Sequence, residues 1–186
     1  AAVLLGRWLK CPVTITLRGT EVRHARDRAL RPLLIKALTD AARIITVSDS
    51  LRRLALELGV APERAQVVAN GVDAQKFHPA DRAAMRARFG LPAEARVLIT
   101  VGGLVERKGF HRVIELLPAL LQRFPDLHYL VVGGACAEGD WGGRLRQQVA
   151  ALGLEGRVHF IGTIHPEALR EPLSAADVFV LSTRNE

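Results

Sequence analysis

Residues 96–112 read RVLITVGGLVERKGFHR, and this stretch decides the fold. Its opening run, VLITV, is almost entirely aliphatic and β-branched, as in a strand covered on both faces of a parallel sheet. Gly102 and Gly103 end the run, and without a Cβ they let a ligand approach the backbone closely. Lys108 and Gly109 are expected to open a helix, whose unpaired first amides and dipole favour an anion. The pattern predicts a strand, a turn of phosphate size and a helix.

A second interpretation fits the same residues. The stretch contains neither a Walker sequence nor G-x-G-x-x-G, so spacing alone does not separate a phosphate site from an ordinary strand-to-helix turn. In that case Arg107 and Lys108 are a solvated pair of surface cations. The residues by themselves leave both interpretations open.

Hydrophobic periodicity predicts that strands and helices alternate along nearly the whole chain. In the first part we expect strands at 13–17, 43–47 and 66–69, with helices at 30–42 and after Ser48. In the second part we expect strands at 97–101, 127–132, 158–161 and 178–181, with helices at 110–123, 145–152 and 166–174. Such alternation predicts an α/β protein with Rossmann-like parallel sheets. Because the composition changes after Pro79, we divide the chain into domains at 1–75 and 76–186.

Composition and charge exclude several classes of protein. The 186 residues are 49% hydrophobic, which is ample for a buried core, and the net charge is +7. The densest basic cluster, residues 23–31, has no interleaved aromatic residues for base stacking, so we expect no nucleic-acid partner. Cys11 and Cys136 lie far apart without ligand spacing, so we expect neither a metal nor a disulfide. No run of 18 apolar residues occurs, and we expect a cytoplasmic protein.

Three motifs in order carry a resemblance to a known family. They are NGVDAQKFHP at residues 70–79, VLITVGGLVERKG at 97–109 and AADVFVLSTRNE at 175–186. The chain resembles the family-4 glycosyltransferases of the GT-B fold, also called the group 1 family, which show NGVD-x-x-x-F-x-P, VGRL-x-x-x-KG and ADVFVLPS-x-x-EG. Nearly the whole chain follows that order. The resemblance implies a two-lobed GT-B architecture, present here in incomplete form, with an acceptor-side and then a donor-side domain.

The resemblance also implies a hexosyltransferase activity. Such an enzyme moves a sugar from a nucleoside-diphosphate sugar to a hydroxyl acceptor, here with retention of configuration and without a metal. The nucleotide sugar is the donor substrate and no further cofactor is implied. The acceptor is an unidentified carbohydrate or lipid-linked molecule, and the basic charge suits peripheral association with the inner face of a membrane as well as it suits a solvated Arg-rich helix.

The donor-binding residues implied by the resemblance lie in the second half of the chain: Gly102, Gly103, Lys108, Thr163 and Glu186. The family usually has Arg at the position of Gly103, and that Arg is absent here. No catalytic residue is assigned.

The loop after the first strand departs from the family pattern His-Gly-Ser/Thr-Asp. Arg18 takes the place of the His, and Glu21 takes the place of the Asp. We regard Arg18 and Arg107 as candidates for contact with a phosphate or an acceptor, although each is also explained as a surface cation. The glycine-rich loop at 132–141 is expected to border the nucleotide, or else to be a flexible turn with Cys136 as a buried apolar group.

Both ends of the sequence look cut, since Glu186 matches only the first Glu of the family's E-x7-E. We therefore expect the 186-residue chain to be inactive by itself. Two alternatives stay open: a GT-B nucleotide-sugar epimerase, and a non-enzymatic Rossmann-like binding module. An NAD enzyme is disfavoured because G-x-G-x-x-G and its trailing acid are absent.

Overall fold

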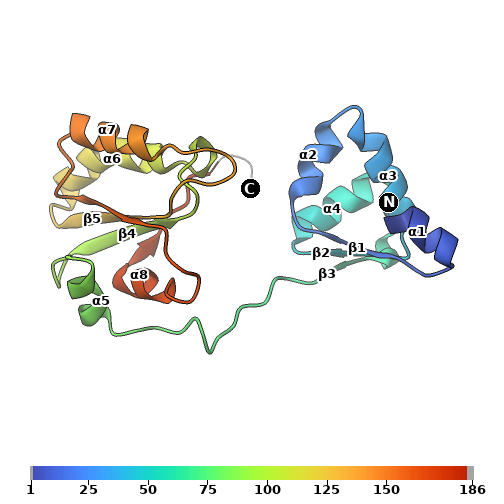
Figure 1. The fold of residues 1–186 in the computed structure, drawn as a ribbon, viewed down its shortest axis with the longest axis horizontal. Helices are drawn as coiled ribbons and strands as arrows, with labels where there is room; N and C mark the ends of the chain where they lie inside the picture. Colours follow the sequence, from blue (N-terminus) through green and yellow to red (C-terminus); the bar gives the residue numbers. More distant parts are fainter. Residues whose placement is uncertain (1, 184–186) are drawn as a thin grey trace. The chain divides into compact units, whose positions relative to one another are not determined.

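The protein is described by a computed structural model in which residues 2–183 are placed. The chain divides into two compact units, Ala1–Val72 and Asp73–Glu186 (Figure 1). Each unit is described by itself below. Both are α/β units built on parallel sheets, so the predicted fold class is confirmed.

The first unit is built on a parallel sheet of order β1-β2-β3. Its elements are α1 (Ala2–Leu9), β1 (Thr14–Leu17), α2 (Thr20–Arg26), α3 (Leu30–Asp40), β2 (Arg43–Thr46), α4 (Asp49–Glu57), the 3-10 turn η1 (Pro62–Arg64) and β3 (Ala65–Val67). Leu17, Leu38 and Ile44 are fully buried in its core, together with the apolar stripe of α4. Alternation along β1 and β2 therefore points the core-facing side chains toward the helices.

Local capping explains where α4 begins. The Ser48 hydroxyl accepts a hydrogen bond from the Leu51 amide at 3.4 Å, which satisfies one of the unpaired amides of the first turn. The predicted start of a helix after Ser48 is confirmed. The loop expected after β1 is shorter than predicted, because α2 already begins at Thr20 and the Glu21 carboxylate accepts hydrogen bonds from the amides of Arg18 and Gly19.

The second unit is built on a parallel sheet of order β6-β5-β4-β7. Its elements are α5 (Arg82–Arg88), β4 (Arg96–Val101), the 3-10 turn η2 (Glu106–Lys108), α6 (Phe110–Arg123), β5 (Leu127–Val132), α7 (Gly142–Ala151), β6 (Val158–Gly162), α8 (Arg170–Ala175) and β7 (Val178–Phe179). The predicted parallel pairing of β4 with β7 is confirmed, with Leu98 opposite Val178.

Helices cover both faces of this second sheet (Figure 1). On one face α6 and α7 enclose a core that includes Phe110, Ile114 and Tyr129. On the other face α5 and α8 enclose a core that includes Val97 and Leu130. Every residue of β5 is buried, which explains why its sequence, LHYLVV, is almost continuously apolar.

The strand order creates a switch point next to β4. The chain adds β5 and β6 on one side of β4 and then returns through α8 to place β7 on the other side. In open α/β sheets, ligands bind in the crevice at the carboxyl ends of the strands where the order reverses. The loops that follow β4 and β7 are therefore the expected borders of a ligand site.

Some expected element boundaries are wrong. The helix expected to open at Lys108 begins instead at Phe110, because Gly109 adopts a left-handed conformation with φ 74° and separates α6 from η2. The helix expected from residue 166 begins only at Arg170. No helix was expected at α1.

In the part of the chain that is described, no helix is both long and apolar enough to cross a bilayer.

A buried ion pair connects four elements of the second unit. Arg86 of α5 is 6% exposed, and its Nη2 donates to Asp177 Oδ2 at 2.9 Å. The same oxygen accepts the Val97 amide of β4 at 2.8 Å, and Arg86 Nε donates to the Ala175 carbonyl at the end of α8 at 3.1 Å. Asp177 leads directly into β7, so this pair fixes the edge strand, both helices of one face and the start of β4.

We expect Arg86→Met to lower the free energy of unfolding of the second unit by about 3 kcal/mol, because it leaves the Asp177 carboxylate without its buried partner. That figure is at the low end for a buried pair, since Asp177 keeps 31% of its side chain exposed. Urea unfolding followed by Trp141 fluorescence in a Trp8→Phe background would measure it. The control is Arg88→Met on the same helix, whose ion pair with Glu171 is exposed and worth about 1 kcal/mol or less. Equal midpoints for the two variants would contradict the assignment.

Two histidines form a hydrogen-bonded pair on neighbouring strands. His128 Nδ1 lies 2.9 Å from His159 Nε2, and Arg157 Nη1 lies 3.2 Å from His128 Nε2. Since the guanidinium can only donate, His128 carries its proton on Nδ1 and donates it to His159. Burial lowers the pKa of both imidazoles. For His128 the neighbouring His159 and Arg157 lower it further, and Asp126 opposes them.

This pair predicts that the second unit loses stability on acidification. Both folded-state pKa values lie below the ordinary 6.5, so the unfolded chain binds more protons as the pH falls below that value. The stabilisation is complete above pH 6.5 and is lost as the pH falls through the folded-state pKa values. His159→Gln, which can still accept the bond, should flatten this dependence between about pH 7.5 and pH 5, whereas the exposed His165→Gln should not. Urea midpoints measured across that range decide the matter, and parallel curves for His159→Gln and the wild type would refute the prediction.

Candidate functional site

Three strand ends meet through their backbones at the carboxyl edge of the second sheet. Glycine stands at or just after the end of each strand: Gly102 after β4, Gly133 after β5 and Gly162 at the end of β6. The Gly102 amide donates to the Val132 carbonyl at 3.0 Å, and the Gly133 amide donates to the Gly162 carbonyl at 2.8 Å. A Cβ on Gly133 would lie 1.8 Å from the Gly102 oxygen, so no side chain fits there. The edge is therefore built from main-chain atoms.

Lys108 lies against this edge. Its Cδ and Cε are 3.5 Å from the position that a Cβ on Gly102 would occupy. The 3-10 turn η2 holds it there, with the Lys108 amide donating to the Val105 carbonyl at 3.2 Å and the Gly109 amide donating to the Glu106 carbonyl at 3.0 Å. The structure thus brings Lys108 and Gly102 together, although Lys108 ends a 3-10 turn and does not open a helix.

The loop after β5 packs onto the turn after β4. The Leu104 amide donates to the Gly134 carbonyl at 2.9 Å, and the Trp141 amide donates to the Leu104 carbonyl at 2.6 Å. Between these two anchors, Cys136 Sγ is 2.7 Å from the Cβ position of Gly103. A side chain at position 103 would therefore displace Cys136. The interpretation of Cys136 as a buried apolar group is wrong, because the residue is exposed.

Arg107 is held by an acid of this loop. Its Nε and Nη2 contact the two carboxylate oxygens of Glu138 at 3.0 Å and 2.8 Å, in a two-pronged ion pair. The hydrogen bond from Arg107 lowers the pKa of Glu138. The sequence pointed to Arg107 as a candidate phosphate contact and missed Glu138, because the two lie 31 residues apart without a motif to connect them.

The other predicted site residues lie in different places. Thr163 follows β6 and contacts the loop after β5, with its Oγ1 2.5 Å from the Cβ position of Gly134. Arg18 belongs to the first unit, where it is exposed at the carboxyl end of β1. Glu186 lies outside the described residues. The structure therefore brings together Gly102, Gly103, Lys108 and Thr163 at one edge.

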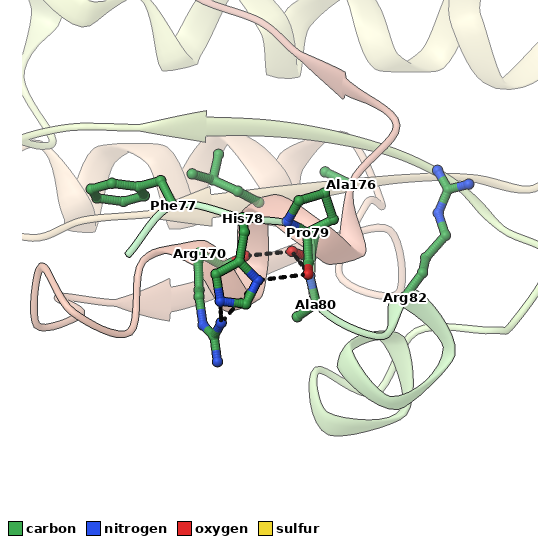
Figure 2. Close-up of a pocket in the computed structure, with 9 residues that line it drawn as sticks. Phe77, His78, Pro79, Ala80, Arg82, Arg170 and Ala176 are labelled. Atoms are coloured by element: carbon green, nitrogen blue, oxygen red, sulfur yellow. Dashed lines mark hydrogen bonds between the residues drawn. The ribbon is translucent and has the colours of Figure 1, made fainter. Parts of the chain in front are cut away.

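A separate cavity of about 460 Å³ lies in the second unit between the segment at 77–82 and helix α8 (Figure 2). The sequence did not indicate it, and none of the predicted site residues lines it. Its basic side chains already have partners. Arg170 donates to His78 Nε2, and Arg82 is paired with Asp177. The Ala80 amide also donates to the Ser174 hydroxyl at 2.9 Å, so these contacts hold the segment onto α8.

The glycine edge is the better candidate for chemistry. Preorganised backbone dipoles and a lysine at the carboxyl ends of parallel strands suit an anionic group, and they can stabilise negative charge that develops on a leaving oxygen. Parallel strand ends and a topological switch point are also where α/β proteins bind nucleotides.

Comparison with known proteins shows the family of the chain. The family model described as "Glycosyl transferases group 1" matches residues 81–186, and that described as "Glycosyltransferase Family 4" matches residues 1–76. The D-inositol 3-phosphate glycosyltransferase of Geodermatophilus obscurus is 34% identical over 157 residues, covering 81% of this chain and 35% of the relative. The 2-deoxystreptamine glucosyltransferase of Streptomyces kanamyceticus is 28% identical, covering all of this chain and 50% of the relative. The chain thus spans between about a third and a half of their length.

Solved structures show the same fold. The crystal structure of Anabaena Alr3699/HepE in complex with UDP matches with a TM-score of 0.84 at 24% identity, covering 97% of this chain and 49% of that one. WaaG, a glycosyltransferase involved in lipopolysaccharide biosynthesis, matches with a TM-score of 0.65 at 18% identity, covering 92% and 51%. These similarities identify both units as parts of a GT-B fold. Because the group 1 model matches more than half of its residues, this chain belongs to the glycosyl transferases group 1 family.

Proposed function

We propose that the protein transfers a sugar from a nucleoside-diphosphate sugar to a hydroxyl acceptor, and that the glycine edge of the second unit binds the donor's diphosphate. The observation that carries the proposal is the position of Lys108 alongside Gly102, at the carboxyl end of β4 and beside the switch point. The named relatives are glycosyltransferases, and Anabaena HepE has been crystallised with UDP and with UDP-glucose. These similarities favour transfer over epimerisation.

The chemical argument concerns the charge on the leaving group. Breaking the bond between the sugar and the diphosphate leaves negative charge on the diphosphate, and this charge is stabilised by donors that are already in place. We assign this role to the Lys108 ammonium and the Gly103 amide, because the Gly102 amide already donates to the Val132 carbonyl. Arg107 is already paired with Glu138, so we assign it to holding the loop and not to the phosphate.

The finer parts of the proposal rest on the family resemblance. We assign residues 1–75 to the acceptor-side domain and residues 76–186 to the donor-side domain. The reaction would retain the anomeric configuration and would not require a metal. Thr163 would contact the nucleoside part of the donor, and Glu186 would also bind the donor. The acceptor would be a carbohydrate or a lipid-linked molecule met at the cytoplasmic face of a membrane.

We expect the 186-residue chain to bind UDP or another nucleoside diphosphate weakly, with a dissociation constant of about 1 mM, equivalent to about 4 kcal/mol. Lys108→Ala should weaken that binding by about 1 to 3 kcal/mol, because a charged hydrogen bond is lost. NMR titration with UDP, GDP and ADP measures both constants. The control is Lys76→Ala, which removes a lysine that lies 5.7 Å over the Phe77 ring in the same unit. Equal affinities for the two variants would exclude Lys108 from the site.

A further inference from the structure

The segment that follows β7 is still held by hydrogen bonds after the pairing of β7 with β4 ends. The Val180 amide still donates to the Ile99 carbonyl at 2.8 Å. The Val180 carbonyl accepts from Thr100 Oγ1 at 2.6 Å, and the buried Tyr129 hydroxyl in turn donates to Thr100 Oγ1 at 2.7 Å. The segment after β7 is therefore tied to the core of the sheet.

Two residues further on, this segment closes a ring of hydrogen bonds with the start of α6. The Ser182 hydroxyl donates to the Gly109 carbonyl at 2.7 Å, and Arg112 Nη1 donates to the Ser182 carbonyl at 2.9 Å. The Arg112 amide donates to the same Gly109 carbonyl at 3.0 Å. A Cβ on Gly109 would lie 2.1 Å from the Ser182 oxygen, and φ is 74°, so the contact requires glycine.

We propose that Arg112 and Ser182 are positioning residues that hold Lys108 in place along Gly102; this inference rests on the proposed function. Gly109 directly follows Lys108 and is the left-handed residue at which η2 gives way to α6. The ring fixes Gly109 from both sides, through its carbonyl and through the close approach of Ser182. The guanidinium of Arg112 donates to a carbonyl of the protein, so it affects ligand binding only by fixing the backbone conformation.

The same contacts also place the end of β7 beside the turn after β4. These are the two loops that border the switch point, and the side chains of Arg112 and Ser182 join them. A change at Arg112 therefore alters two borders of the donor site at once. If Arg112 only stabilised α6, its loss would instead lower the stability of the whole unit.

The experiment compares four variants of the 186-residue chain with the wild type. Arg112→Ala removes the link, Arg112→Lys keeps one donor, Ser182→Ala removes the hydroxyl, and Arg123→Ala is the matched control at the other end of α6. Three quantities are measured: the exchange rate of the Val180 amide by NMR, the dissociation constant for UDP, and the urea midpoint reported by Trp141.

We expect Arg112→Ala to speed exchange at Val180 about tenfold, the equivalent of 1.4 kcal/mol for a local opening, and to weaken UDP binding about fivefold. Ser182→Ala should act in the same direction, and Arg112→Lys should recover part of both effects. Arg123→Ala should change neither.

Three outcomes would contradict either the positioning role of Arg112 or the proposed function. Identical exchange and affinity for Arg112→Ala and Arg123→Ala would refute the positioning role. An equally large fall in the urea midpoint, with uniformly faster exchange, would show that Arg112 is only a stabilising residue. If the wild type binds no nucleoside diphosphate, the proposed function fails, and the exchange rate at Val180 alone decides whether the ring holds the end of β7.

Discussion

The second unit depends on the ion pair between Arg86 and Asp177. A buried guanidinium is unfavourable unless each of its donors finds an acceptor, and Arg86 meets this requirement with the Asp177 carboxylate and backbone carbonyls, among them that of Ala175. The carboxylate also accepts a hydrogen bond from the Val97 amide, directly before the residues at which β4 pairs with β7. If β7 were not anchored there, its two-residue pairing with β4 would be too short to define an edge.

The position of that edge strand determines where the site can form. With β7 beside β4, the loops after these strands lie on either side of a switch point, and the glycine edge lies beside that point. Lys108, the loop after β5 that contains Cys136, and the ring at Gly109 are arranged around this edge. The proposed donor site at one end of the sheet therefore depends on an ion pair at the other end, because both are connected by the length of β4.

The sequence predicted the elements that have a strong internal pattern. The strand at 127–132 and the helix at 110–123 are found at the expected residues, because their apolar positions repeat with the period of a strand and of a helix. It also identified Gly102 and Lys108, which the structure brings together.

The contacts that the sequence did not reveal are those between residues distant in the chain. Glu138 with Arg107, and Arg112 with Ser182, are each brought together only when the sheet forms, and neither pair has a characteristic spacing. The separate expectation that Lys108 and Gly109 open α6 is wrong for a local reason, since glycine is compatible both with a helix start and with a left-handed turn. Gly109 has the left-handed conformation, and Ser182 packs closely against it.

The contact between Gly102 and Gly133 has a consequence for how such proteins diverge. Only main-chain atoms form this contact, so most neighbouring side chains can be substituted during evolution without moving the backbone at this edge. Gly133 itself cannot change, because the first added carbon would collide with the Gly102 carbonyl. Homologues can therefore lose nearly all recognisable sequence similarity and still present the same backbone at this edge, while new specificities arise in the surrounding loops.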